Sequence, residues 1–285
     1  MRKMNIDNLF EKESRIPSLP QVFYQFKEAV EDTDTSFEKL AGIIECDLGL
    51  TARLLKIVNS PFYGFPSQVE TIPHAISIIG NNQLNDLVLS TCIIDHFKNI
   101  PQKSMDMQLF WEHSIACGLT AKIIAKHFRS ADPESIFVGG LVHDIGRLVI
   151  CINAPQKFTE IFLKTESEGK SLLEAEKIIL GFGHDEVGGE LLRRWKLPKV
   201  HEESVRFHHD PSKALLFPKE AAIIKIANSI VKLLTLGCSG DLLAPEIEKE
   251  PKAILGIKDE EVFTKIKQEV QEQYQSTNQI FLENA

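Results

Sequence analysis

The sequence predicts an all-α protein, and three observations support that prediction. Apolar residues recur at helical rather than strand spacing in almost every segment. Capping residues, prolines and glycines fall where helices should begin and end. Hydrophobic residues make up 43% of the 285 positions and charged residues 25%, which is the balance of an ordinary globular protein. We therefore expect a multi-helical bundle with a substantial buried core.

Capping residues define the first two predicted helices. Thr35 and Glu38 have the spacing of a capping box, and an apolar stripe follows them to Ile44. Asp47 can cap the next helix, which ends before Pro61. These signals predict two consecutive helices between positions 35 and 60.

An aromatic loop separates these helices from the next pair. Residues 61–68, PFYGFPSQ, contain two prolines and a glycine, so we expect a loop. Three aromatic side chains could anchor a binding partner or pack inside the protein, namely Phe62, Tyr63 and Phe65. Thr71 as a cap, Pro73 in the first turn and Gly80 at the end predict a further helix. Another helix is expected from about 83 to 96.

The polar stretch KNIPQKSMD, residues 98–106, predicts a boundary before the segment that carries most of the histidines. Beyond it we expect helices over 107–128, 133–150, 171–181, 184–195, 199–209 and 218–236. Residues 237–250 predict a loop, and 258–280 predict one or two closing helices. The apolar positions of this last segment could pack within the chain, which we favour, or form a dimer face. They are Val262, Phe263, Ile266 and Val270.

Bulk properties exclude several classes of protein. The formal charge of −8 argues against a protein that coats nucleic acid, so we expect no nucleic-acid partner. The N-terminus has no apolar region typical of a secretory signal, and no apolar run approaches the roughly 20 residues of a membrane span. We expect a cytoplasmic protein that does not bind membranes. Its cysteines are expected to be buried reduced thiols, at Cys46, Cys92, Cys117, Cys151 and Cys238.

Five of the nine histidines fall into one pattern, mostly on the apolar sides of predicted helices. They are His113, His143, His184, His208 and His209, with Asp144 directly after the second. Burying an ionised carboxylate without a partner costs several kcal/mol, which favours a ligand or ion-pair role for Asp144. Imidazole and carboxylate groups in the core of a helical bundle suit a first-row divalent cation. We expect ordinary core or surface roles for the remaining histidines, His74, His96, His127 and His201.

The surroundings of His143 leave two roles open for a nearby arginine. Gly139 and Gly140 precede the histidine and let another helix approach closely. Arg147, one turn after His143, could hold a phosphate or another anion. It could equally pair with Asp144 and leave no site for a metal.

Several stretches together resemble a known family. LVHDIGRL, WEHSIACGLTAK and GHDEVGGELLRRWKLPKVHEESVRFHH are similar to the HD superfamily and, more narrowly, to the HDOD domain, the HD-related output domain of bacterial signal transduction. The opening half, from IPSLPQVFYQF onward, is also similar, so the resemblance runs from about Ile16 to Leu236. It implies an HD-like helical bundle with an N-terminal helical subdomain packed on it. The implied parts are an N-terminal segment (1–15), a helical half (16–100), an HD-like half (101–236) and a C-terminal helical extension (237–285).

The resemblance also implies metal ligands, residue by residue. The superfamily ligands would fall on His113, His143, Asp144 and a final position, which is Asn228 here instead of aspartate. The additional histidines of the HD-GYP branch, which hydrolyses cyclic di-GMP, correspond to His184, His208 and His209. The acidic ligand of that branch would fall at Leu109, which cannot coordinate a metal, and no Gly-Tyr-Pro motif follows the last histidine.

These departures limit the chemistry. Two divalent cations held close together need several carboxylates, and this pattern supplies only Asp144. No spare glutamate that could act as a general base is evident near the pattern. We therefore expect at most one strongly held divalent ion, either iron, manganese or zinc, with nickel entering only from purification.

The resemblance implies a regulatory or scaffolding role, because HDOD proteins have no established reaction. We expect a module that binds other signalling proteins, without robust catalysis and with no catalytic residue assigned. The alternative is a metal-dependent phosphohydrolase or phosphodiesterase that acts on a nucleotide or cyclic dinucleotide.

Overall fold

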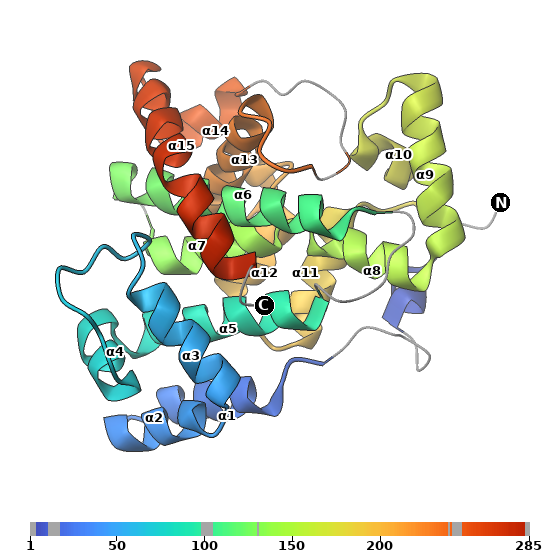
Figure 1. Cartoon of the computed structure of the whole chain (residues 1–285). Coiled ribbons are helices and arrows are strands. Elements are labelled where there is room, and N and C mark those ends of the chain that lie inside the picture. The colour runs from blue at the N-terminus through green and yellow to red at the C-terminus, as the bar shows by residue number, and fades with distance from the viewer. Residues whose placement is uncertain are drawn as a thin grey trace. The chain divides into compact units, whose positions relative to one another are not determined.

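The computed structural model describes residues 4–10, 18–97, 105–129, 131–238, 240 and 247–282 (Figure 1). Helices and connecting turns account for all of these ranges, and no strand occurs within them, so the all-α prediction is confirmed. The predicted boundary at 98–106 lies mostly outside the described residues, as does much of the predicted loop at 237–250.

The chain divides into two compact units by its internal contacts. One unit contains residues 1–17 and 101–270, and the other contains residues 18–100 and 271–285. The segment 237–285 is thus shared between the units. Its long helix, α15 (Glu261–Leu282), contributes its first part to one unit and its second part to the other.

The helices of residues 18–100 begin largely as their caps predict. They are α1 (Gln21–Glu31), α2 (Phe37–Glu45), α3 (Leu48–Val58), α4 (Ile72–Ile79) and α5 (Asn81–Phe97). The Asp47 side chain accepts a hydrogen bond from the amide of Leu50 (2.9 Å), and Thr71 caps α4 in the same way. The cap of α2 is Ser36 and not Thr35, because the Ser36 hydroxyl accepts from the amide of Lys39. The apolar periodicity did not predict α1.

The aromatic loop packs within its own unit. The Phe62 ring is 5% exposed and meets the Phe281 ring edge-on, with 5.7 Å between the ring centroids. Tyr63 and Phe65 stack on each other at 5.7 Å. Phe62 is therefore a core residue and does not serve as an exposed anchor for a partner.

The other unit carries the remaining described helices. They are η1 (Ile6–Phe10), α6 (Met107–Phe128), α7 (Pro133–Val142), α8 (Ile145–Asn153), α9 (Pro155–Glu168), α10 (Leu172–Ile179), α11 (His184–Arg194), α12 (Lys199–Arg206), η2 (Pro211–Lys213), α13 (Pro218–Leu233) and α14 (Lys249–Ile254). Two differences from the sequence prediction stand out. The helix expected at 133–150 breaks into α7 and α8 at the His143–Asp144 turn, and α9 occupies a stretch for which no helix was predicted.

Most of the apolar positions of the closing helix pack within the chain. Phe263, Ile266 and Val270 are at most 5% exposed. The predicted packing of this segment is therefore confirmed for these three side chains.

One stretch of the described residues has the length and hydropathy of a membrane span. Pro133–Asn153 has a mean hydropathy of 1.7, and 89% of the window is buried inside the protein. No unbroken apolar run was evident in the sequence because His143, Asp144 and Arg147 interrupt the stretch. Core helices of globular proteins commonly have the same composition.

The cysteines differ in exposure, and none forms a disulfide. Cys92, Cys117 and Cys151 are buried as expected, whereas Cys46 and Cys238 are exposed. Both exposed cysteines lie beyond the ends of helices, where the apolar pattern no longer applies.

Candidate metal centre

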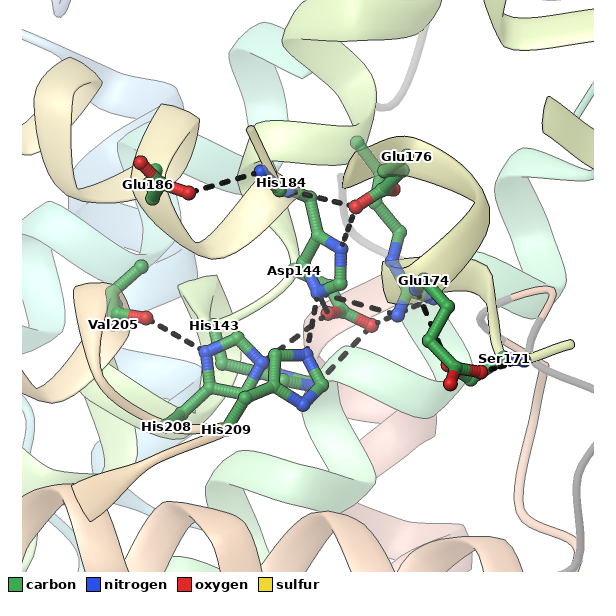
Figure 2. A network of polar contacts seen from close by, with 12 residues as sticks. His143, Asp144, Ser171, Glu174, Glu176, His184, Glu186, Val205, His208 and His209 are labelled. Carbon is green, nitrogen blue, oxygen red and sulfur yellow. Dashed lines mark hydrogen bonds and ion pairs between the residues drawn. The ribbon is translucent and has the colours of Figure 1, made fainter. Parts of the chain in front are cut away.

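Six side chains of the predicted pattern meet inside the unit that contains residues 101–270. One is His113 from α6. The other five are labelled in Figure 2: His143 and Asp144 from the turn between α7 and α8, His184 from the start of α11, and His208 and His209 from the segment after α12. All are buried except His209, which is half-buried. Ligand atoms of these residues form two groups whose members lie within 4.8 Å of one another.

Glycines allow the backbones that carry these side chains to approach closely. A Cβ on Gly140 of α7 would lie 2.8 Å from the Cα of Gly118 in α6. A Cβ on Gly146 of α8 would lie only 2.0 Å from the carbonyl oxygen of His184 in α11. The contact between α6 and α7 places His113 beside His143, and the contact between α8 and α11 places Asp144 beside His184.

The first group, which we call the HD triplet, consists of His113, His143 and Asp144. The rings of the two histidines have their centroids 5.5 Å apart. His143 donates from Nδ1 to the carbonyl oxygen of Gly140 (2.8 Å), which directs Nε2 toward the Asp144 carboxylate at 3.3 Å. The HD triplet thus contains two imidazoles and one carboxylate, whereas the second group contains no carboxylate.

Arg147 pairs with Asp144, as one of the two predicted roles requires. Its Nη1 lies 3.1 Å from Oδ2 of Asp144, and both side chains are 0% exposed. The guanidinium also lies 3.4 Å from Nε2 of His184. An arginine so fully enclosed and paired is not a surface site for an external anion.

The second group, which we call the histidine triplet, consists of His184, His208 and His209. The Nε2 atoms of His184 and His209 lie 2.9 Å apart, and the rings of His208 and His209 have centroids at 4.0 Å. His208 donates from Nδ1 to the carbonyl oxygen of Val205 (2.7 Å), so its Nε2 faces the group. Asp144 links the two triplets, because its Oδ1 lies 3.1 Å from Nε2 of His184 and 3.9 Å from Nε2 of His208.

A buried glutamate, which the sequence analysis missed, supports His184. Glu176 of α10 is 1% exposed, and its Oε2 lies 2.6 Å from Nδ1 of His184 (Figure 2). The statement that no spare glutamate lies near the pattern is therefore wrong. A signal was present, because Glu176 shares a helical face with Leu172 and Ala175, both of which are fully buried.

The surroundings shift the pKa values of these histidines in different directions. Burial lowers the pKa of His113 to about 3, and the positive His143 acts in the same direction. Burial disfavours the charged ring of His143 too, but the adjacent Asp144 carboxylate raises its pKa to about 10. Burial likewise lowers the pKa values of His208 and His209 well below their ordinary range. Asp144 stays ionised, because Arg147 and His143 outweigh its burial and hold its pKa well below the ordinary value.

The donor set fits a single divalent ion of borderline softness. Nε2 atoms of His113 and His208 are buried and have no hydrogen-bond partner, and Nε2 of His143 faces only the Asp144 carboxylate. A buried nitrogen left without a partner is costly, and coordination to a metal would remove that cost. Because Arg147 already pairs with the Asp144 carboxylate, the available donors are mainly imidazole nitrogens, which suit iron or zinc better than a hard cation such as magnesium.

The other sequence-predicted positions differ in burial. Asn228 of α13 is 6% exposed and its Oδ1 has no hydrogen-bond partner, but no described contact joins it to either triplet. Leu109 is 40% exposed. The histidines expected to have ordinary roles are absent from both metal-competent groups of described residues, and His127 pairs with Glu269 at 3.0 Å.

Sequence comparison assigns most of the chain to one domain type. Residues 16–211 match the sequence model of the HDOD domain. An uncharacterized protein of Treponema pallidum (strain Nichols) is 26% identical over 226 residues, which cover 77% of this chain and 42% of that protein. The chain thus spans less than half the length of this curated relative.

Solved structures share the fold. An HDOD domain protein of unknown function from Geobacter sulfurreducens superposes with a TM-score of 0.78 at 23% identity, over 98% of each chain. A candidate phosphohydrolase from Shewanella amazonensis gives 0.75 at 21% identity, also over 98% of each chain. A candidate signal transduction protein from Marinobacter aquaeolei gives 0.70 at 18% identity, over 99% of this chain and 62% of the other. At these identities the likeness shows the fold alone.

Proposed function

Because this chain belongs to the HDOD domain family, whose sequence model matches residues 16–211, we propose that it is a regulatory or scaffolding module of signal transduction. In this proposal it binds other signalling proteins through its helical surface. Its buried histidines hold at most one divalent ion, which has a structural or sensory role and does not turn over a substrate.

The charge of the candidate metal centre carries this proposal. Asp144 is the one carboxylate in the two triplets, and the buried guanidinium of Arg147 already balances it. Hydrolysis at two metal ions needs several anionic ligands to hold both cations and to activate a water molecule. Neutral imidazoles cannot supply that charge, so the arrangement favours binding over catalysis.

A bound ion would be held by imidazole nitrogens of the two triplets. It would supply Lewis acidity and a rigid link between helices. Backbone groups orient two of these rings in advance. The carbonyl oxygens of Gly140 and Val205 accept hydrogen bonds from Nδ1 of His143 and His208, so Nε2 of each ring faces the centre. The strength of the connection between the α7–α8 turn and the end of α12 would then depend on whether a metal ion is bound.

The competing function is a metal-dependent phosphohydrolase. It is favoured by the convergence of six potential ligands and by the fold shared with a candidate phosphohydrolase. The absence of a second carboxylate among the described ligand groups counts against it.

Metal analysis and an activity assay separate the two functions. The protein is purified without nickel resin or chelator and analysed for bound metal. It is then assayed on bis(4-nitrophenyl) phosphate and on cyclic di-GMP with added Mn²⁺ or Fe²⁺. We expect at most one ion per chain and no turnover.

The matched variants are His143→Ala and His74→Ala, since His74 lies exposed on α4. We expect His143→Ala to lower both metal content and thermal stability, and His74→Ala to change neither. Multiple turnovers that His143→Ala abolishes and His74→Ala preserves would overturn the regulatory proposal.

A further inference from the structure

A carboxylate outside both triplets holds one of the candidate ligands. Glu176 lies on the buried face of α10, where a glutamate is costly to keep unless its charge is compensated. The sequence places it eight residues before His184, on a different helix. Its burial is explained by what its side chain contacts.

One oxygen of Glu176 holds His184 by two groups. Oε2 accepts a hydrogen bond from the backbone amide of His184 at 2.8 Å and lies 2.6 Å from Nδ1 of its ring. Two bonds to the same oxygen fix both the backbone and the ring of this residue. The ring therefore has one favoured orientation, with Nε2 directed at Asp144 and His209 (Figure 2).

This contact also determines which ring nitrogen can coordinate. The Nδ1–H group donates a hydrogen bond to the carboxylate, so Nε2 is the ring nitrogen that can coordinate a metal. Backbone carbonyl oxygens accept the same kind of hydrogen bond from Nδ1 of His143 and of His208. A carboxylate in that position additionally makes the imidazole a more basic ligand, and loss of such a partner typically weakens metal binding 10- to 100-fold.

We infer that Glu176 is a positioning residue that orients His184 as a metal ligand of the histidine triplet. The inference rests on the proposed function, in which the triplets hold one ion. It adds a residue of α10 to the candidate centre and predicts that His184 is one of the ligands that hold the ion.

Cobalt binding to three variants tests the inference. Co²⁺ affinity is measured by competition with a coloured chelator, and the visible spectrum of bound Co²⁺ reports its coordination. We expect Glu176→Leu, which removes the acceptor at similar volume, to weaken binding 10- to 100-fold and to change the spectrum. Glu176→Gln keeps an acceptor oxygen without the charge, so it should bind with intermediate affinity.

Glu174→Gln is the control, because Glu174 lies exposed on the same helix and caps it through Ser171. We expect this variant to lose some stability and to retain wild-type Co²⁺ affinity and spectrum. If Glu176→Leu does not fold, Glu176→Gln carries the test, with a loss of at least several-fold expected against this control.

The possible failures are distinguishable. Wild-type affinity and spectrum in both folded Glu176 variants would overturn the role of Glu176 and leave the proposed metal site intact. Failure of the wild-type protein itself to bind Co²⁺ would overturn the metal site, and the inference with it.

Discussion

The two triplets are built from similar side chains but differ in charge. The HD triplet contains Asp144, whose carboxylate forms ion pairs with His143 and the buried Arg147. The histidine triplet contains only imidazoles: Asp144 of the other triplet faces Nε2 of His184, and Glu176 contacts the opposite side of the same ring. The difference shows that ligand identity alone does not define a hydrolytic centre. The distribution of negative charge around the ligands matters as much.

The largest expected effect comes from removing the carboxylate that the two triplets share. Asp144→Ala leaves the Arg147 guanidinium buried without its ion-pair partner, so we expect a loss of about 3–5 kcal/mol in the free energy of unfolding. Urea denaturation of the metal-free protein measures this loss.

The matched controls are Arg147→Met alone and Asp144→Ala combined with Arg147→Met, which removes both charges together. We expect the double variant to be more stable than Asp144→Ala alone, with a coupling of about 1–3 kcal/mol between the two sites. Simple addition of the two single losses would show that the ion pair has no energetic role.

The second effect concerns the contact that joins the two triplets. Gly146→Ala would place a Cβ 2.0 Å from the carbonyl oxygen of His184, and a backbone atom cannot move aside as a flexible side chain can. We expect about 3 kcal/mol of destabilisation and weaker Co²⁺ binding, because α8 must move away from α11. Thermal melting and Co²⁺ titration measure the two consequences.

Gly42→Ala is the control for this substitution. A Cβ on this α2 glycine meets nothing within 4 Å, so alanine should stabilise the helix by up to about 1 kcal/mol. An equal change in stability for the two variants would contradict the close contact at Gly146.

The effect that is smallest per unit of the varied condition is a slope in stability against pH. The pKa of His143 rises from 6.5 to about 10 on folding, against the effect of burial, because of Asp144. Between these values the folded protein holds a proton that the unfolded chain has released. This contribution is fully present below pH 6.5 and is lost toward pH 10, so stability falls with rising pH by up to about 1.4 kcal/mol per unit. Urea denaturation of the metal-free protein at pH 6.5, 8 and 9.5 measures the slope.

His113 should contribute a slope of the opposite sign. Burial lowers its pKa to about 3, so the unfolded chain binds more protons than the folded protein between pH 3 and 6.5, and stability rises with pH. We expect His143→Gln to reduce only the alkaline slope and His113→Gln only the acid slope. An unchanged alkaline slope in His143→Gln would contradict the assigned ion pair.

The sequence predicted those parts of the fold that depend on local signals. The caps at Asp47 and Thr71 are found where short-range hydrogen bonding requires them. The break at His143–Asp144 was not predicted, because the apolar pattern continues through it without a proline. The helix α9 was also missed.

The convergence of the histidines followed from the resemblance and not from spacing. His113 and His209 are 96 positions apart in the sequence, and only tertiary contacts bring their helices together. Glu176 was missed for the same reason, since its partner lies on another helix. The pairing of Arg147 with Asp144 could be suggested from their spacing of three, but the choice between pairing and anion binding required the burial of both side chains.

The enclosed guanidinium has a consequence for the metal-free chain. Many small metal-binding domains unfold when their ion leaves, because the ligands then repel one another or lack partners. Here Arg147 is a permanent counter-ion of Asp144 that no chelator can extract, and it keeps this buried carboxylate paired when no metal ion is present. If an ion binds as proposed, its occupancy can follow the surrounding metal concentration while the tertiary structure persists, and the empty and loaded states would be two forms of one folded protein.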